Sequence, residues 1–256
     1  MEIIESLRSR ITTALINALE PLPIVLAGWE GGSAAFGAVD SYSDIDLNFV
    51  VVDGASSDLL YAKSEASLET VSPITVRHFV PPGRYYKLKD SGEFLLVDLS
   101  FFPVGATDRP LEVERHGHVR PLFDKGDWLR PRPLDENALA TRRDTRYGEI
   151  LGWFVVSQSF VRKAVLRRQE VEALACFWSY TVKPLTELLR MRYCPVRWDF
   201  GMRYLDRDLP STVYVQLRDL MFVRDLGEIE AQLPAATAWG VTLLRELDVT
   251  ARGRTG

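Results

Sequence analysis

The chain contains 256 residues, of which 46% are hydrophobic and 26% charged, and its formal net charge is −4. This length is enough for two modest domains, each with a core of its own. The negative charge argues against a protein that grips long nucleic acids through their phosphates. The two cysteines are typical of reduced core thiols, and no apolar run is long enough for a transmembrane helix.

The first residues predict an amphipathic helix, because apolar side chains recur there at helical spacing: Ile4, Leu7, Ile11, Leu15 and Ala18. The start of the chain is acidic and lacks the basic-then-apolar layout of a signal peptide. We therefore expect a cytoplasmic protein with no membrane association.

A short apolar run, residues 24–29, predicts a strand, and a glycine-rich turn follows it. Gly31 and Gly32 let the backbone turn sharply and bring its N–H groups close to an anion. The residues after the turn can begin a short helix, whose N-terminus favours negative charge. Because the Ser33 hydroxyl can add a hydrogen bond to a phosphate oxygen, this segment predicts a phosphate-binding turn.

Two aspartates lie eleven residues beyond that turn, in a stretch where polar and apolar residues alternate over 44–50. Alternation predicts a strand, so Asp44 and Asp46 project from the same face, about 7 Å apart along the backbone. Their mutual repulsion is relieved by a hard dication such as Mg²⁺, which prefers oxygen ligands and keeps substrate phosphates. A solvated edge strand is the alternative, and the upstream Gly-Ser turn favours the metal site over it.

A third aspartate, Asp98, interrupts residues 94–102, which otherwise form the most apolar predicted strand of the sequence. An isolated carboxylate buried there would cost roughly several kcal/mol of folding free energy. Its presence is explained if it faces a metal ion or a reacting hydroxyl, whereas a strand end covered by a loop is the alternative. We expect Asp98 to lie on a strand beside the first two aspartates.

The segment comprising Gly32-Ser33, Gly37 and residues 43–47 resembles the signature of the DNA polymerase β-like nucleotidyltransferase superfamily. Within that superfamily the chain is most similar to the antibiotic nucleotidyltransferases, the aminoglycoside and lincosamide adenylyltransferases. In those enzymes an all-helical domain follows the catalytic domain. Residues 116–125 also resemble the closing strand and turn of such catalytic domains.

The resemblance implies a function for each motif residue. Asp44 and Asp46 would bind two Mg²⁺ ions, and Asp98 would be a further metal ligand or the general base toward the acceptor hydroxyl. ATP would be the co-substrate. The residues implied to contact its triphosphate are Gly32, Ser33 and Ser43.

The remaining patterns predict an α+β fold in two parts. Residues 53–70 are helical in part, strands run over 73–80 and near 119–123, and together with the earlier strands they form a mixed sheet flanked by helices. The closely spaced prolines at 131–133 mark the boundary. We therefore assign residues 1–132 to a nucleotidyltransferase catalytic domain and 133–256 to a helical bundle that forms the acceptor wall.

In the helical half, apolar residues recur at helical spacing over 147–165 and 171–189, where Pro184 should kink or interrupt the second run. Ser211 is expected to cap a helix that ends near 225, and a last helix is expected over 235–248.

Residues 192–205 combine arginines and aromatic residues in a predicted loop. In related antibiotic enzymes a Lys followed by an aromatic residue near this point reaches the phosphates, and Arg203-Tyr204 stands here instead. Arg203 would serve as a bidentate phosphate ligand. The equal alternative is that the aromatic residues fill the core and the arginines are at the surface, and Lys183 is open in the same way.

The leading hypothesis is an adenylyltransferase for antibiotic resistance: it would move AMP from ATP to a hydroxyl of a small, aminoglycoside-like molecule and release pyrophosphate. One alternative keeps the fold and modifies a protein side chain or an RNA end. Another is a catalytically silent nucleotide-binding module. Enzymes of this kind occur as monomers and as dimers, so a homodimer is compatible with the resemblance.

Overall fold

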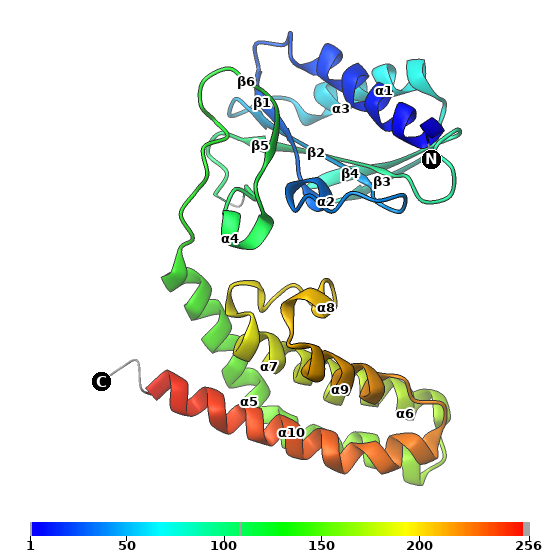
Figure 1. The fold of residues 1–256 in the computed structure, drawn as a ribbon, viewed down its shortest axis with the longest axis vertical. Coiled ribbons are helices and arrows are strands. Elements are labelled where there is room, and N and C mark those ends of the chain that lie inside the picture. The colour runs from blue at the N-terminus through cyan, green and yellow to red at the C-terminus, as the bar shows by residue number, and fades with distance from the viewer. Residues whose placement is uncertain (1, 108, 253–256) are drawn as a thin grey trace. The chain divides into compact units, whose positions relative to one another are not determined.

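The structure, a computed structural model, describes residues 2–107 and 109–252. The chain divides into two compact units, Met1–Leu134 and Asp135–Gly256 (Figure 1). None of the helices in the described residues combines the length and the apolar character that a bilayer crossing requires. The fold class predicted from the sequence, α+β with a mixed sheet and a helical C-terminal part, is confirmed.

The first unit is built on a six-stranded sheet of order β3-β4-β5-β2-β1-β6. The central pair, β2 and β5, is parallel, and every other neighbouring pair is antiparallel. The strands are β1 (Val25–Glu30), β2 (Ile45–Val51), β3 (Ile74–Val80), β4 (Gly83–Leu88), β5 (Val97–Pro103) and β6 (Arg120–Asp124).

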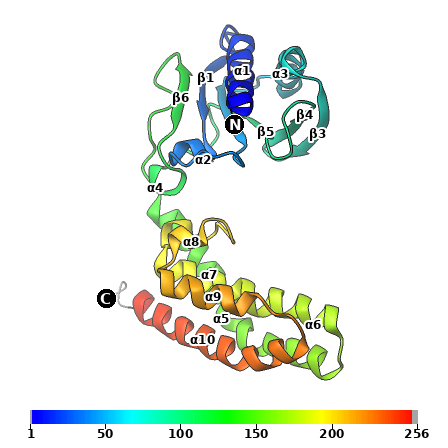
Figure 2. The same ribbon diagram turned by 45° about the vertical axis from the view of Figure 1, so that its right-hand side comes forward.

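Two long helices cover one face of this sheet: α1 (Glu2–Leu19) and α3 (Ser57–Val71) (Figures 1 and 2). They pack side by side, and the Ser67 hydroxyl donates to the carbonyl of Ala14 at 2.8 Å. Strand alternation delivers Ile45, Leu47 and Phe49 to this face, where they are fully buried with apolar residues of both helices. The main core of the unit therefore lies between α1, α3 and the sheet.

The opposite face of the sheet has an apolar half and a polar half. Around Trp29, Val50 and Phe102 a second buried cluster forms under the loop segments that contribute Leu111 and Leu129. At the other end of the same face, the residues that strand alternation brings to this side are polar. Two short helices lie on this side of the unit (Figure 1), α2 (Gly32–Ala35) and α4 (Val113–His116).

The second unit is all helical. Its long helices α5 (Glu136–Leu166) and α10 (Leu226–Arg252) pack together, and Gly240 permits the close approach because a Cβ there would lie 2.3 Å from the Phe154 ring. The Tyr147 hydroxyl donates to the carbonyl of Leu244 at 2.8 Å. The elements are α5 (Glu136–Leu166), α6 (Glu170–Cys176), the π-helical segment η1 (Phe177–Val182), α7 (Lys183–Tyr193), the 3₁₀ turn η2 (Pro195–Arg197), α8 (Leu205–Asp208), α9 (Ser211–Met221) and α10 (Leu226–Arg252).

Two strands of the first unit differ from the sequence-based expectation. β4 was not predicted, because Arg84-Tyr85-Tyr86 shows no clean alternation, yet it forms a hairpin with β3. β5 begins at Val97 rather than at residue 94. In both cases the pairing partner rather than local propensity decides which residues form the strand.

In the second unit, the interruption expected at Pro184 takes the form of η1, which ends directly before α7. The predicted Ser211 cap is wrong: Pro210 occupies the cap position, and no side-chain cap bond forms. That helix ends at Met221, and α10 begins at Leu226 instead of near 235. The late predicted start has a simple cause, because Pro234 lies inside α10, where a proline normally argues against a helix.

Candidate active site

The turn after β1 is held against the first strand aspartate. Gly32 adopts a φ of +53°, and a Cβ at this position would lie 1.8 Å from Oδ2 of Asp46. The neighbouring Gly31 N–H donates to the main-chain carbonyl of Asp46 at 2.9 Å. Position 32 therefore requires glycine for two reasons: the backbone conformation there has a positive φ, and the Asp46 carboxylate takes the space that a Cβ would need.

The same turn begins α2 and leaves main-chain donors available. The N–H groups of Ala34 and Ala35, which come later in the turn, already donate hydrogen bonds to the carbonyl of Gly31. Within the described residues, the N–H groups of Gly32 and Ser33 donate to no other group, as is usual for a first helical turn. Both amides belong to the segment that packs on the Asp46 carboxylate. An anion bound there would lie next to whatever cation the carboxylate holds.

Asp46 and Asp98 face each other across the parallel pair at the centre of the sheet. They are register partners on β2 and β5, so their side chains project from the same face of adjacent strands. Asp44 immediately precedes β2, and its Oδ1 accepts the N–H of Leu96 at 3.2 Å. The Ile45 N–H donates back to the carbonyl of Leu96 at 2.9 Å. The ends of the two strands are thereby tied together beside the carboxylates.

The three carboxylates influence one another electrostatically. Burial, followed by the charges of Asp98 and Asp44, raises the pKa of Asp46 to about 6, against the opposing effect of Arg8. Burial and the charge of Asp44 also raise the pKa of Asp98, although a hydrogen bond from Tyr85 acts in the other direction. Each raised pKa reports an ionised form that lacks compensation. A cation at this point would remove that penalty.

The fit to a divalent metal can be tested on the donor set itself. No group of three or more histidine, cysteine, aspartate or glutamate side chains among the residues that the structure describes is arranged to hold a metal ion. Magnesium, however, is commonly bound by one or two carboxylates together with substrate phosphates and waters. The neighbouring Asp46 and Asp98, with the free amides of Gly32 and Ser33, match that mode. Shared coordination by all three aspartates stays a prediction.

Two residues of the site were missed in the sequence. Tyr85 is the β4 register partner of Asp98, and its hydroxyl hydrogen bonds to that carboxylate while burial raises the Tyr85 pKa to about 12. Arg8 reaches from α1 to the carbonyls of Ser43 and Asp44 at 2.6 and 3.1 Å. Arg8 could have been noticed, because a charge on the apolar face of a helix signals a buried partner. Tyr85 could not, since its strand was not recognised.

Arg8 also forms an ion pair with Glu30 at 3.3 Å, and both side chains are almost fully buried. Glu30 in turn accepts a hydrogen bond from Arg120 of β6 at 3.3 Å. These contacts join α1, the end of β1 and the segment that leads into β2. They fix the backbone that carries the first aspartates without occupying the polar face of the sheet.

The other predicted nucleotide contacts fall in different surroundings. Ser43 is engaged in a local turn, where its hydroxyl donates to Oδ1 of Asp40 at 2.8 Å and accepts the Asp40 N–H. Ser33 lies in the first turn of α2, half-buried. Arg203 and Lys183 belong to the helical unit, and the Arg203 guanidinium lies 5.5 Å from the centre of the Phe200 ring. Their contact with a triphosphate stays a prediction.

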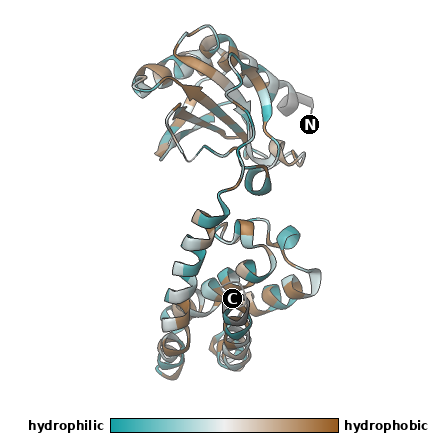
Figure 3. Cartoon of the chain, turned by 90° about the vertical axis from the view of Figure 1, so that its left-hand side faces the viewer, coloured by the Kyte–Doolittle hydropathy of each residue, from teal (hydrophilic) through white to brown (hydrophobic). Residues whose placement is uncertain are grey.

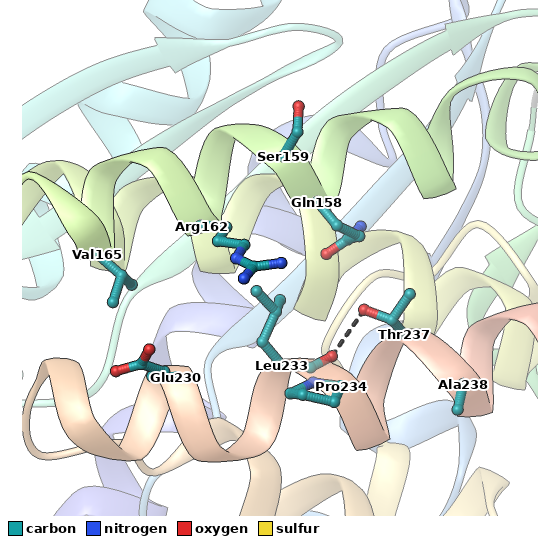
Figure 4. A pocket seen from close by; sticks show the side chains of 9 residues that line it. All are labelled: Gln158, Ser159, Arg162, Val165, Glu230, Leu233, Pro234, Thr237 and Ala238. Carbon is teal, nitrogen blue, oxygen red and sulfur yellow. Dashed lines mark hydrogen bonds between the residues drawn. The ribbon is translucent and has the colours of Figure 1, made fainter.

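A cavity of about 720 Å³ opens between α5 and α10 of the helical unit (Figure 4). Arg162 and Glu230 lie on its opposite helices, and the Thr237 hydroxyl donates to the carbonyl of Leu233 at 2.6 Å. None of the predicted catalytic residues lines it. The remaining lining residues are Gln158, Ser159, Val165, Pro234 and Ala238.

No protein-family model and no curated protein matches the chain. Among solved structures, the spectinomycin adenyltransferase AAD(9) from Enterococcus faecialis, determined with ATP and spectinomycin, is similar with a TM-score of 0.42 and 10% identity over 95% of this chain and 99% of that one. The STING-associated CdnE c-di-GMP synthase from Capnocytophaga granulosa is similar with a TM-score of 0.33 and 14% identity over 98% of this chain and 83% of that one. Both likenesses are low, so the functional assignment rests on the geometry of the site.

Proposed function

We propose that this chain is a metal-dependent nucleotidyltransferase that transfers AMP from ATP to a hydroxyl of a small molecule and releases pyrophosphate. The observation that carries the proposal is the register of Asp46 and Asp98 on adjacent parallel strands, with the Gly32 turn packed directly on Asp46. This combination supplies carboxylates for a cation and main-chain donors for an anion at one end of the two central strands of the sheet. Metal-bound nucleoside triphosphates need both.

Different residues of the site would bind the phosphates and the metal ion. The amides of Gly32 and Ser33 would donate to phosphate oxygens, and the Ser33 hydroxyl would add a further donor. Asp46 and Asp98 would hold Mg²⁺, with Asp44 as the third carboxylate. Bound there, Mg²⁺ supplies charge neutralisation for the α-phosphate and for the leaving pyrophosphate.

Asp98 would also remove the proton of the acceptor hydroxyl. As that proton moves to the carboxylate, the acceptor oxygen forms its bond to the α-phosphorus and the bond to the β-phosphate oxygen breaks, so pyrophosphate leaves. The raised pKa of Asp98 suits a proton acceptor better than that of an exposed aspartate. The Tyr85 hydroxyl, hydrogen bonded to Asp98, would orient the carboxylate toward the acceptor. Positioning and charge neutralisation would provide most of the rate enhancement.

The helical unit is proposed to supply the wall for the acceptor, with Arg203 as a phosphate ligand. An aminoglycoside-like antibiotic is the acceptor class that we favour, because the motif around Gly32-Ser33 and residues 43–47 resembles that of the antibiotic nucleotidyltransferases.

The direct test is to incubate the protein with α-labelled ATP and Mg²⁺ and to offer aminoglycosides, proteins and RNA in parallel. Label on an aminoglycoside, together with released pyrophosphate, is the expected result. Label on macromolecules alone would move the acceptor to the protein or RNA alternative. ATP binding without transfer to any acceptor would identify a silent nucleotide-binding module.

Variants tie the activity to the site. Asp98→Asn and Asp46→Asn should each lower transfer by at least about 10²-fold, since both remove a negative charge from the reacting centre. Asp53→Asn is the matched control. Asp53 follows the far end of β2, and its Oδ1 accepts the Gly105 N–H at 2.9 Å, a bond that asparagine can keep. Equal loss in all three variants would contradict the assignment.

A further inference from the structure

The long helix α5 exposes apolar side chains on the side that faces away from its own bundle. Ile150, Phe154 and Val161 are buried on the inner side. On the other side Trp153 and Val156 remain 49% and 55% exposed. Phe160 is exposed on the same side of the helix. Figure 3 shows the helix hydrophilic in its first turns and hydrophobic further along.

A contiguous apolar patch of this kind on a surface helix indicates an interaction site rather than scattered exposure. Its aromatic members are ordered against each other: the ring centres of Trp153 and Phe160 are 5.8 Å apart, and those of Phe160 and Tyr180 are 5.7 Å apart. The patch is therefore a preformed surface of the helical unit. We call it the α5 face and define it by Glu149, Gly152, Trp153, Val156, Phe160 and Lys163, with Ser159, which also lines the cavity between α5 and α10, at its border.

The α5 face has a regular order along the helix. Glu149, Val156 and Lys163 are seven residues apart, so they follow one another along a single line of the helix, as in a coiled-coil seam. Gly152 and Ser159 lie between them, and a Cβ added at Gly152 would meet nothing within 4 Å. One end of the seam is acidic, the middle is apolar with small gaps, and the other end is basic.

We propose that the α5 face pairs with the α5 face of a second copy of this chain, antiparallel and centred on Val156. In such a two-fold pair, position 156 − n lies opposite position 156 + n of the other copy. Glu149 then lies opposite Lys163 of the partner subunit, and this ion pair occurs twice. Gly152 lies opposite Phe160 of the partner subunit, where the missing side chain leaves room for a ring.

Charge selects the antiparallel arrangement. A parallel pair would bring Glu149 against Glu149 and Lys163 against Lys163, and like charges at such positions are unfavourable. Contacts within the single chain keep both charged side chains beside the seam. The Glu149 carboxylate accepts a hydrogen bond from Arg146 at 2.6 Å, and the Lys163 ammonium lies 5.4 Å from the Phe160 ring centre. The face is thus complementary to itself in one orientation.

The first test measures the oligomeric state by sedimentation velocity over the micromolar range. The wild-type chain should show a concentration-dependent dimer, and Val156→Glu should raise the dimer dissociation constant by at least about tenfold, because it places two like charges at the centre of the pair. Val171→Glu is the matched control. Val171 is 85% exposed on α6 and lies outside the α5 face, so this variant should dimerise as the wild type does.

The second test distinguishes this pairing from any other use of the patch. Glu149→Lys and Lys163→Glu should each weaken the dimer, whereas the double variant should restore it by re-forming both pairs with reversed charge. Circular dichroism would confirm that all variants are folded. A wild-type chain that stays monomeric, or single charge variants whose weakening simply adds in the double variant, would overturn the proposal.

Discussion

At the scale of single residues, Gly32 is the most constrained position of the candidate site. Gly32→Ala would meet both a positive φ of +53° and a Cβ contact of 1.8 Å with the Asp46 carboxylate. The carboxylate or the turn must shift, so we expect an increase in KM for ATP and a loss of kcat of at least about tenfold. The left-handed conformation should add a loss of about 1 kcal/mol in the free energy of unfolding.

Gly54→Ala separates the two causes. Gly54 also has a positive φ, +76°, but a Cβ there would meet nothing within 4 Å. This variant should lose similar stability and keep its activity. Steady-state kinetics with ATP and chemical denaturation of both variants make the comparison. Equal activity losses would show that backbone strain, rather than the contact with Asp46, is responsible.

Asp46 gives the metal-free protein a characteristic pH dependence. Its folded-state pKa is raised to about 6, whereas an unfolded aspartate titrates near 4. Between about pH 4 and pH 6 the folded chain therefore binds more protons than the unfolded chain, and stability contributed by this group is lost as the pH rises through 6. From about pH 7 to about pH 5 we expect a gain of about 1 kcal/mol, allowing for partial screening by solvent.

Urea denaturation in the presence of a chelator tests this expectation. The gain is the difference between the wild type and Asp46→Asn, whose side chain does not titrate, so pH effects elsewhere in the chain cancel. Parallel pH profiles for the two proteins would contradict the raised pKa. Adding Mg²⁺ and ATP should stabilise the wild type at neutral pH, where the carboxylate is ionised, more than it stabilises the variant.

At the scale of elements, the hairpin of β3 and β4 completes the site by carrying Tyr85 to Asp98. Because the Tyr85 hydrogen bond lowers the pKa of Asp98, Tyr85→Phe should raise that pKa and move the acidic limb of the activity profile to higher pH. The expected loss of kcat is about fivefold, equivalent to a bond of about 1 kcal/mol. The measurement is kcat as a function of pH.

Tyr86→Phe is the control on the same strand. The Tyr86 hydroxyl donates to Glu65 at 3.1 Å on the face that packs against α3. Its loss should change the stability and leave the pH profile of kcat in place. A shift of the acidic limb in both variants would mean that the hairpin acts through stability rather than through the Asp98 carboxylate.

The same elements show what a sequence can and cannot predict here. Alternation over 44–50 predicts which face of β2 carries Asp46, because side chains alternate along any strand. The lone carboxylate in an apolar stretch predicts that Asp98 lies on a neighbouring strand, and the pairing of β5 with β2 confirms it, but neither pattern predicts that Asp98 falls in register with Asp46. Register depends on long-range pairing, which a local pattern does not contain. The contact of Gly32 with Asp46 depends on that tertiary arrangement as well.

At the scale of the whole molecule, each of the two units has its own packing, and the second is organised around a residue that the sequence patterns did not indicate. Arg190 of α7 is fully buried and pairs with Asp208 at 2.7 Å. Its guanidinium also donates to the carbonyls of Gly201 and Arg197 at 2.7 and 3.1 Å, and to that of Arg203. Helical periodicity alone assigns no such role to an arginine.

Arg190→Met should destabilise the helical unit by about 3 to 5 kcal/mol, because it leaves the buried Asp208 short of a partner and several carbonyls without a donor. Differential scanning calorimetry of the full chain should show two transitions, of which the one from the helical unit falls by about 10 °C or more. Hydrogen bonds from Arg197 and Arg190 hold the pKa of Asp208 below its usual range despite burial. In the variant that pKa should therefore rise.

Arg192→Met provides the comparison within the same helix. Arg192 pairs with Glu246 at 3.3 Å, and both side chains are about half exposed, so the loss should be at most about 1 kcal/mol. ATP binding, which we assign to the first unit, should persist in both variants at temperatures below the first transition. If Arg190→Met instead shifts one common transition for the whole chain, the two units fold as one cooperative body, and the stabilising contribution of Arg190 extends beyond its own helices.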